Sequence, residues 1–258
     1  MDLLLKDKVI VVTGGAKGFG LGIVEVLAKE GAIPVIVGRS KEDNQQALDK
    51  LNVSGSFQVT AELSKSEECK KAIDAIVKQF GKIDGLVNNA GVNDGVGLEH
   101  GSYERFMDSL HKNLVHYYLM AHHALPFLKK SKGAIVNIGS KTAETGQGNT
   151  SAYAAANGGR NALTREWAVE LLPHGIRVNA IIVAESYTPL YESWIKTFPN
   201  PEERLKSITA KIPLEKRMTT TEEIANMAVF LLSEKSSHTT GQLIHVDGGY
   251  VHLDRAIG

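Results

Sequence analysis

Ser140 and Tyr153 are the two residues whose types and spacing point most directly to chemistry. They lie thirteen residues apart in a stretch that runs from Asn137 to Trp167. Ser140 follows a strand-like apolar run, and Tyr153 is expected near the start of an alanine-rich helix. A phenol has a pKa of about 10, so it acts as a base near neutral pH only beside a cation. A serine hydroxyl nearby could donate to the oxygen on which negative charge develops.

The position where that cation would be expected carries an asparagine. Residues four apart lie on one face of a helix, and the residue four after Tyr153 is Asn157. An amide has no charge, so Tyr153 is expected to stay mostly protonated at neutral pH. Lys141 is the best candidate for a substitute cation, and Lys112 is also nearby in the sequence. Arg160, two helical turns from Tyr153, is expected to lie away from the site.

Strand and helix patterns alternate along the whole chain and predict the elements that position these residues. Strands are expected at 8–13, 33–37, 56–61, 85–88, 134–138, 177–182 and 242–246. Helices are expected at about 21–30, 41–51, 67–79, 103–130, 151–172 and 221–232, with a break near Pro126. The alternation predicts a single α/β domain built on a doubly wound parallel sheet, with a helical substrate lid at about 186–212.

Composition excludes several classes of protein. A chain of 258 residues, 43% of them hydrophobic, suits one domain with a large core. The formal net charge of +0 and the lack of a basic stripe argue against nucleic acid as a partner. One cysteine excludes an internal disulfide, and no Cys/His group has zinc spacing, so no metal is expected. Without a long apolar run or a signal-peptide pattern, a cytoplasmic protein with no membrane contact is expected.

A glycine cluster between the first strand and the first helix predicts a dinucleotide site. Gly14, Gly18 and Gly20 allow a tight turn and close approach of the backbone to a pyrophosphate. The N-terminus of the following helix offers free N–H groups to the phosphates.

The end of the second strand favours NADP over NAD. Many NAD sites have an acidic residue there, but this chain has Gly38 followed by Arg39. A glycine does not repel a 2′-phosphate, and an arginine can bind one through two parallel hydrogen bonds. Lys17 adds a second cation. The alternative is that Arg39 only stacks on the adenine and Lys17 is a solvated loop residue.

Together these motifs resemble those of the short-chain dehydrogenase/reductases, along nearly the whole chain. The matching residues are Gly14-x-x-x-Gly18-x-Gly20, Asn88-Asn89-Ala90-Gly91, Asn113, Ser140, Tyr153 and Arg177-Val178-Asn179-Ala180. The resemblance implies a Rossmann fold, NADP or NAD as cofactor, and a homotetramer. Residues 89–95, 140–143, 146–150 and 246–255 look like the L-fucose dehydrogenase branch of that family.

The resemblance also implies roles for individual residues. Tyr153 would be the general acid/base, Ser140 would hold the substrate oxygen, and Asn113 would anchor a water of the proton relay. The family has a lysine at the position of Asn157, where it binds the nicotinamide ribose. Contacts to the cofactor are expected from Gly14, Lys17, Gly18, Phe19, Gly20, Arg39, Glu62, Leu63, Asn89, Ala90, Gly91, Tyr153, Asn157, Val183 and Thr188.

The expected reaction is hydride transfer between NAD(P) and a hydroxyl/carbonyl pair, most specifically oxidation of an aldose such as L-fucose to its lactone. Sugar contacts are expected from Asn93, Gln147, Glu185 and Tyr191. Two departures from the family leave an alternative open: the lysine position is Asn157, and Val183-Ala184 stands where Pro-Gly is usual. They favour a catalytically weak member that binds cofactor, sugar or a partner, or an asparagine that is not the natural residue.

Overall fold

The computed structural model describes residues 2–51 and 55–254, and it contains one parallel sheet of seven strands in the order β3-β2-β1-β4-β5-β6-β7. The strands are β1 (Val9–Thr13), β2 (Ile33–Gly38), β3 (Phe57–Thr60), β4 (Gly85–Asn88), β5 (Ala134–Ser140), β6 (Arg177–Val183) and β7 (Leu243–Val246). The strand order reverses between β1 and β4, which is where doubly wound sheets bind their ligands. The predicted fold class is therefore confirmed.

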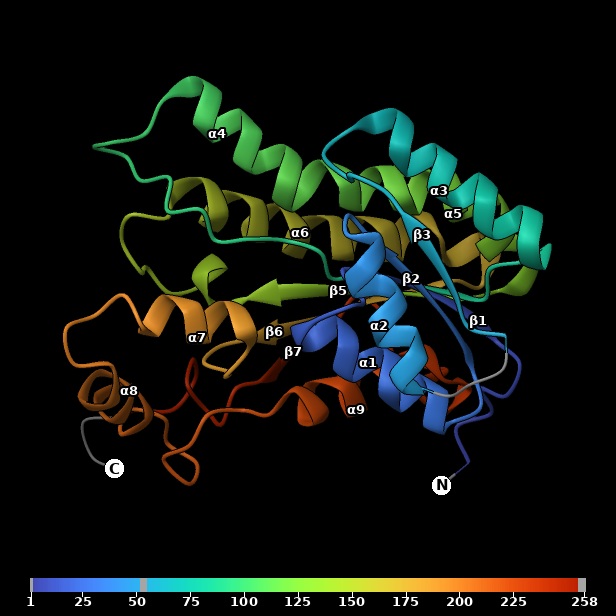
Figure 1. The fold of residues 1–258 in the computed structure, drawn as a ribbon. Coiled ribbons are helices and arrows are strands. Elements are labelled where there is room, and N and C mark those ends of the chain that lie inside the picture. Colours follow the sequence, from blue (N-terminus) through green and yellow to red (C-terminus); the bar gives the residue numbers. More distant parts are fainter. Residues whose placement is uncertain (1, 52–54, 255–258) are drawn as a thin grey trace.

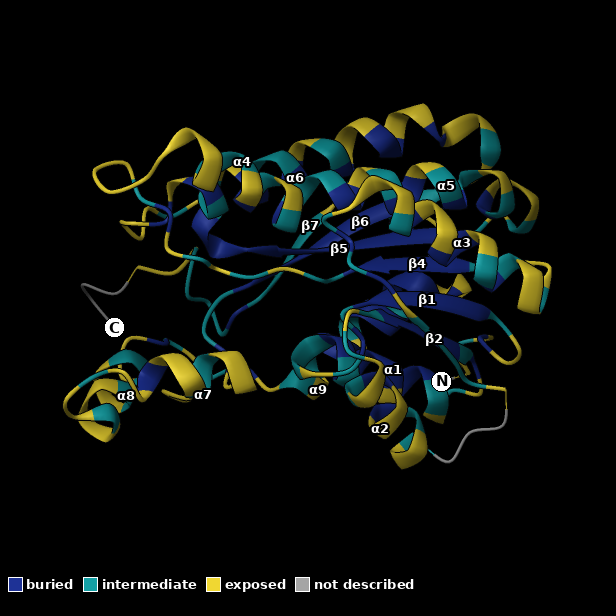
Figure 2. Cartoon of the chain, turned by 45° about the horizontal axis from the view of Figure 1, so that its top comes forward, coloured by how far each residue is buried: buried dark blue, intermediate teal, exposed yellow. Residues whose placement is uncertain are grey.

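Helices cover both faces of the sheet (Figure 1). One face carries α3 (Ser66–Phe80), α5 (His116–Ser131) and α6 (Ser151–Glu170), and the other α1 (Gly18–Lys29), α2 (Lys41–Leu51) and α9 (Thr221–Leu232). Strand β1 shows how the sequence builds two cores: Val9 and Val11 face the first layer, and Ile10 and Val12 face the second. The central strands are consequently buried between helices whose outer surfaces are exposed (Figure 2), whereas the edge strands β3 and β7 are only partly buried.

The long helical stretch before β5 is irregular at a different place from the one predicted. It consists of α4 (Tyr103–Leu110), a π-helical turn (His111–Val115) and α5. The predicted break at Pro126 is wrong: α5 runs through Pro126, because Ala124 and Leu128 on either side are fully buried in the core. The irregularity is the π-helical turn, which contains Asn113, and such turns are frequent at functional sites.

Two short helices occupy the segment between β6 and α9. They are α7 (Pro189–Ile195) and α8 (Pro201–Thr209), which lie at one end of the molecule (Figure 1). Each begins with a proline, a residue that suits the first helical position because it has no N–H to satisfy. Thr188 caps α7 by accepting a hydrogen bond from the Tyr191 N–H at 3.2 Å. The segment is helical as predicted, and its action as a lid stays a prediction.

None of the helices in the described ranges combines the length and the apolar character that crossing a membrane requires.

Candidate active site

A cavity of about 780 Å³ opens at the carboxyl ends of the central strands. It is lined by the loops after β1, β2, β3 and β4, by the end of β5, by α6 and by the start of α7. Most of the residues predicted for cofactor binding meet there: Gly14, Lys17, Gly18, Phe19, Arg39, Glu62, Leu63, Asn89, Ala90, Gly91, Tyr153, Val183 and Thr188. Asn93, predicted for the sugar, also lines it. Segments far apart in the chain thus form one cavity.

The floor of this cavity is tightly packed backbone. A Cβ at Gly20 would lie 2.2 Å from the Gly14 carbonyl oxygen, so no other residue fits at position 20 without a shift. The Thr13 hydroxyl accepts hydrogen bonds from the N–H groups of Asn89 (2.8 Å) and Ala90 (3.1 Å). The Asn89 amide donates in return to the Thr13 carbonyl at 2.9 Å. These contacts join the ends of β1 and β4, and they form a cradle that fits a dinucleotide backbone.

The end of the cavity near β2 has a less positive charge than the sequence indicated. Lys17 forms an ion pair with Asp43 at 2.6 Å, and this contact lowers the pKa of the Asp43 carboxyl. Gly38 is needed for packing: a Cβ there would lie 2.5 Å from the Asn44 side-chain oxygen. Arg39 lines the cavity, and among the residues that the structure describes no acidic side chain pairs with it. Any preference for a 2′-phosphate therefore depends mainly on Arg39.

Ser140 and Tyr153 lie where the sequence predicts, at the end of β5 and near the start of α6. The Ser140 Oγ accepts hydrogen bonds from the Thr142 N–H (3.3 Å) and the Thr142 hydroxyl (3.2 Å). Because a hydroxyl accepts two hydrogen bonds and donates one, the Ser140 proton remains for another acceptor, such as a substrate oxygen. Tyr153 lines the cavity itself.

Asn157 is fully buried and directed at an arginine. Its side-chain N–H group donates to the Tyr153 carbonyl at 2.9 Å, and its Oδ1 accepts from Arg160 Nη1 at 3.0 Å. The amide thus joins the backbone of the tyrosine turn to the guanidinium of Arg160.

The sequence predicted that Arg160 lies away from the site. That prediction is wrong, because Arg160 lines the same cavity as Tyr153. It is only 3% exposed. Its Nε donates to the Asn113 carbonyl at 2.6 Å, its Nη1 donates to the Ile138 carbonyl at 3.1 Å, and the guanidinium lies 4.2 Å from the centre of the Tyr117 ring. All of these acceptors are neutral, and within the described ranges no carboxylate forms an ion pair with Arg160.

The charge of Arg160 acts on the groups around it. Burial lowers the pKa of His116 to about 3, and the Arg160 charge contributes to the same shift. Burial raises the pKa of Tyr117 to about 12, a change that Arg160 opposes and Tyr153 reinforces. A buried charge without a counter-charge is costly. The surroundings of Arg160 therefore favour an anion close to it.

Asn113, the predicted relay residue, holds both Arg160 and the loop after β4. It is fully buried, its Oδ1 accepts from the Val92 N–H at 2.8 Å, and its carbonyl oxygen is the acceptor for Arg160. Gly91 in that loop also lies close to the guanidinium, because a Cβ at this position would be 3.0 Å from Arg160 Nη2. The π-helical turn thus places the Asn113 carbonyl where a guanidinium from α6 reaches it.

Lys141, the predicted substitute cation, is already paired. Its Nζ is in direct contact with Glu185 Oε1 and lies 4.0 Å from the centre of the Tyr250 ring. Burial, and then the Glu185 charge, raise the pKa of Tyr191 well above its usual range. Two predicted sugar residues, Glu185 and Tyr191, therefore lie together with Lys141. Gln147, another predicted sugar residue, is on an exposed loop, and neither it nor Glu185 or Tyr191 is among the residues that line the cavity.

The family model described as enoyl-(acyl carrier protein) reductase matches residues 14–251. The chain belongs to the short-chain dehydrogenase/reductase family. Members of this family use NAD(P), and the cradle between β1 and β4 fits such a cofactor. This short-chain dehydrogenase/reductase is therefore an oxidoreductase.

Several known proteins resemble this short-chain dehydrogenase/reductase over nearly their whole length. The L-fucose dehydrogenase of Bos taurus is 32% identical over 252 residues, which cover 97% of this chain and 92% of the relative. The solved Cj0485 dehydrogenase is 50% identical with a TM-score of 0.95, covering 99% of this chain and 98% of that one. The aldohexose dehydrogenase of Thermoplasma acidophilum is 28% identical with a TM-score of 0.88, covering 97% and 96%.

Arg160 is the residue of this short-chain dehydrogenase/reductase that sequence reasoning missed. A signal was present, because residues three and seven positions apart share a helix face, and Arg160 follows Asn157 by three and Tyr153 by seven. The seven-residue separation from Tyr153 suggested that Arg160 was too distant. A long arginine side chain, however, extends back toward the N-terminus of its helix.

Proposed function

We propose that this protein oxidises the anomeric hydroxyl of a free aldose, L-fucose or a relative, to the lactone, with NADP or NAD as the acceptor. The family membership supports an oxidoreductase, and the names of two relatives, an L-fucose dehydrogenase and an aldohexose dehydrogenase, support a sugar. The observation that best supports an active site is the buried guanidinium of Arg160 beside Asn157, whose hydrogen-bond partners among the described residues are all neutral.

Tyr153 and Ser140 would act on the anomeric hydroxyl. Ser140 donates a hydrogen bond to the sugar oxygen, and Tyr153, as phenolate, accepts the hydroxyl proton. The cradle between β1 and β4 would hold the oxidised nicotinamide, which would supply the hydride acceptor for the anomeric C–H bond. The chain's own residues orient the sugar and move one proton.

Arg160 would supply the positive charge that the family's lysine supplies elsewhere. A positive charge near a phenol favours its ionised form. Asn157 and Asn113 would hold the guanidinium in place, one through its side-chain oxygen and the other through its carbonyl. In this proposal the site keeps a cation, and Asn157 helps to hold it.

Glu185 and Tyr191 would contact the sugar hydroxyls beside Lys141. A carboxylate accepts hydrogen bonds from hydroxyl groups, and an aromatic ring covers the apolar face of a pyranose. Asn93 on the cavity wall and Gln147 on the neighbouring loop would add amide contacts.

NADP is proposed as the preferred cofactor because Arg39 lines the cavity where a 2′-phosphate is expected. Lys17 contributes less, since Asp43 neutralises it. A homotetramer, with α4–α5 and α6 pairing across a two-fold axis, and a lid formed by 186–212 are also proposed. Analytical ultracentrifugation at micromolar concentration tests the first, and a stable monomer would contradict it.

The test of the activity is an aldose panel with each nicotinamide from pH 7 to pH 10, followed by absorbance of the reduced cofactor. We expect turnover with L-fucose-like sugars and a lower KM for NADP than for NAD. If no reduced cofactor forms with any sugar while nicotinamide binding is measurable, the catalytically weak binding protein becomes the better account. That alternative is favoured by the uncharged Asn157 and by Val183-Ala184.

A further inference from the structure

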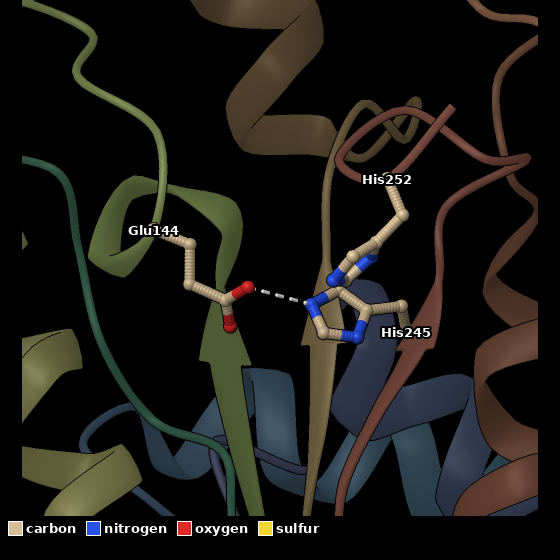
Figure 3. A group of neighbouring side chains, drawn as sticks. All are labelled: Glu144, His245 and His252. Atoms are coloured by element: carbon tan, nitrogen blue, oxygen red, sulfur yellow. Dashed lines mark hydrogen bonds and ion pairs between the residues drawn. The ribbon is translucent and has the colours of Figure 1, made fainter. Parts of the chain in front are cut away.

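Glu144, His245 and His252 converge outside the cavity (Figure 3). Glu144 follows the short 3₁₀ turn after β5, His245 lies in β7, and His252 lies in the C-terminal segment. The Glu144 Oε2 is 3.0 Å from the His245 Nε2, and the two imidazole rings are 4.3 Å apart at 88°. One ligand atom from each residue lies within 4.8 Å of the other two.

We propose that these three side chains bind a divalent transition-metal ion, with zinc as the best fit. Two imidazoles and one carboxylate are a typical zinc donor set, and a water would complete a tetrahedral site. Zinc lies about 2.0–2.2 Å from such ligands, which places ligand atoms roughly 3.3 Å from one another. The Glu144–His245 pair already has this spacing, and a side-chain rotation would bring His252 into place.

A simple ion pair does not account for the third residue. Glu144 and His245 satisfy each other, yet a ring nitrogen of His252 is also directed toward them (Figure 3). The side chains of Glu144 and His245 are 25% and 17% exposed, and His252 is an exposed residue, so the group lies near the surface and is open to an entering ion. No spacing in the sequence signals this site, because Glu144 and His245 are 101 residues apart.

The bound ion would have a structural role. None of its three ligands is among the residues that line the cavity. It would instead join the loop after Ser140 to the C-terminal segment. That segment also contains Tyr250, whose ring covers the Lys141 ammonium next to Glu185. Metal binding would therefore hold Tyr250 and the Lys141–Glu185 pair in place.

The direct test is titration of metal-free, full-length protein with ZnCl₂ by calorimetry, and with CoCl₂ by visible absorption. We expect one ion per chain, a tetrahedral cobalt spectrum, a higher Tm with zinc, and weaker binding as pH falls because protons compete for the ligands. His252→Ala and His245→Ala should each weaken zinc binding at least tenfold. Both residues lie outside the cavity, so nicotinamide affinity should not change.

His122→Ala is the matched control, because His122 is exposed and its ring lies beside another histidine, His123, at 5.1 Å. It should leave zinc binding unchanged. The proposal is overturned if the wild-type protein shows no saturable zinc binding up to 100-fold molar excess. It is also overturned if His252→Ala binds zinc as the wild type does, or if His122→Ala loses as much affinity as His252→Ala.

Discussion

Arg160 and Lys141 are two largely buried cations near the Ser140–Tyr153 pair, and their surroundings differ in one respect. Lys141 is in direct contact with the Glu185 carboxylate, whereas the described partners of Arg160 are all neutral. When a cation is already paired with a carboxylate, the negative charge offsets most of its electrostatic stabilisation of a nearby phenolate. An unpaired guanidinium in a buried site stabilises any anion that forms near it. This difference in charge balance is the reason to propose Arg160, and not Lys141, as the cation of the site.

The largest effect is expected from removing the unpaired cation. Arg160→Met should lower kcat/KM at pH 7 by about 10–1000-fold, because the stabilisation of the Tyr153 phenolate is lost. Activity should return at higher pH, where Tyr153 ionises without help. Arg160→Lys, which keeps a charge, should lose less. Initial rates from pH 6 to pH 10 measure this, with thermal melting as a control for folding.

A lysine at position 157 distinguishes the two accounts of the asparagine. If Arg160 is the working cation, Asn157→Lys places a second buried charge against it and should lower both activity and Tm. If the asparagine only marks a lost lysine, the same substitution should raise turnover by orders of magnitude. Steady-state kinetics with the best aldose decides between these outcomes.

Removing Lys141, the paired cation, should weaken sugar binding and leave the pH profile of activity unchanged. Lys141→Met leaves the Glu185 carboxylate unpaired and should cost about 1–3 kcal/mol of stability. The KM for the sugar should rise, because Glu185 loses its orientation. Lys141→Met/Glu185→Gln should be more stable than Lys141→Met alone. Denaturant melts and sugar KM values test this, and a shift of the pH profile would assign Lys141 the role given to Arg160.

The charge of Arg160 should also affect the stability of the fold at low pH, through His116. His116 is buried with a pKa lowered to about 3, first by burial and then by Arg160. Its unfolded pKa is about 6.5, so the unfolded chain takes up a proton first and the native state loses stability as pH falls below about 6.5. Arg160→Met should raise the native pKa of His116, so the loss should level off at a higher pH than in the wild type. Urea midpoints between pH 2 and pH 7 locate this level, and curves that level off at the same pH would show that burial alone sets the shift.

The smallest effect concerns Arg39. Arg39→Ala should raise the Kd for NADP about tenfold, the loss of roughly one charged hydrogen bond, and leave the Kd for NAD nearly unchanged. Fluorescence titration with each nicotinamide gives both values. A parallel loss for NADP and NAD would instead indicate stacking of Arg39 on the adenine.

The fold and the cofactor cradle could be predicted from the sequence because they depend on local patterns. Buried strands read as apolar runs, and the loops at their carboxyl ends necessarily meet at one edge of the sheet. The charge balance could not be predicted, because it depends on contacts such as Lys141–Glu185, which are 44 residues apart. The π-helical turn around Asn113 was missed for a similar reason, because its contacts to Val92 and Arg160 are distant in the sequence.

The most direct test of the Arg160 assignment is transfer of the charge from position 160 to position 157. The pH profile of kcat/KM is measured for the wild type, for Arg160→Met and for Asn157→Lys/Arg160→Met. The charge assignment predicts that the rise of activity moves to higher pH in the single variant and moves back in the double variant. The assignment is contradicted if Arg160→Met keeps the wild-type profile, or if the double variant stays as impaired as the single one while both fold normally.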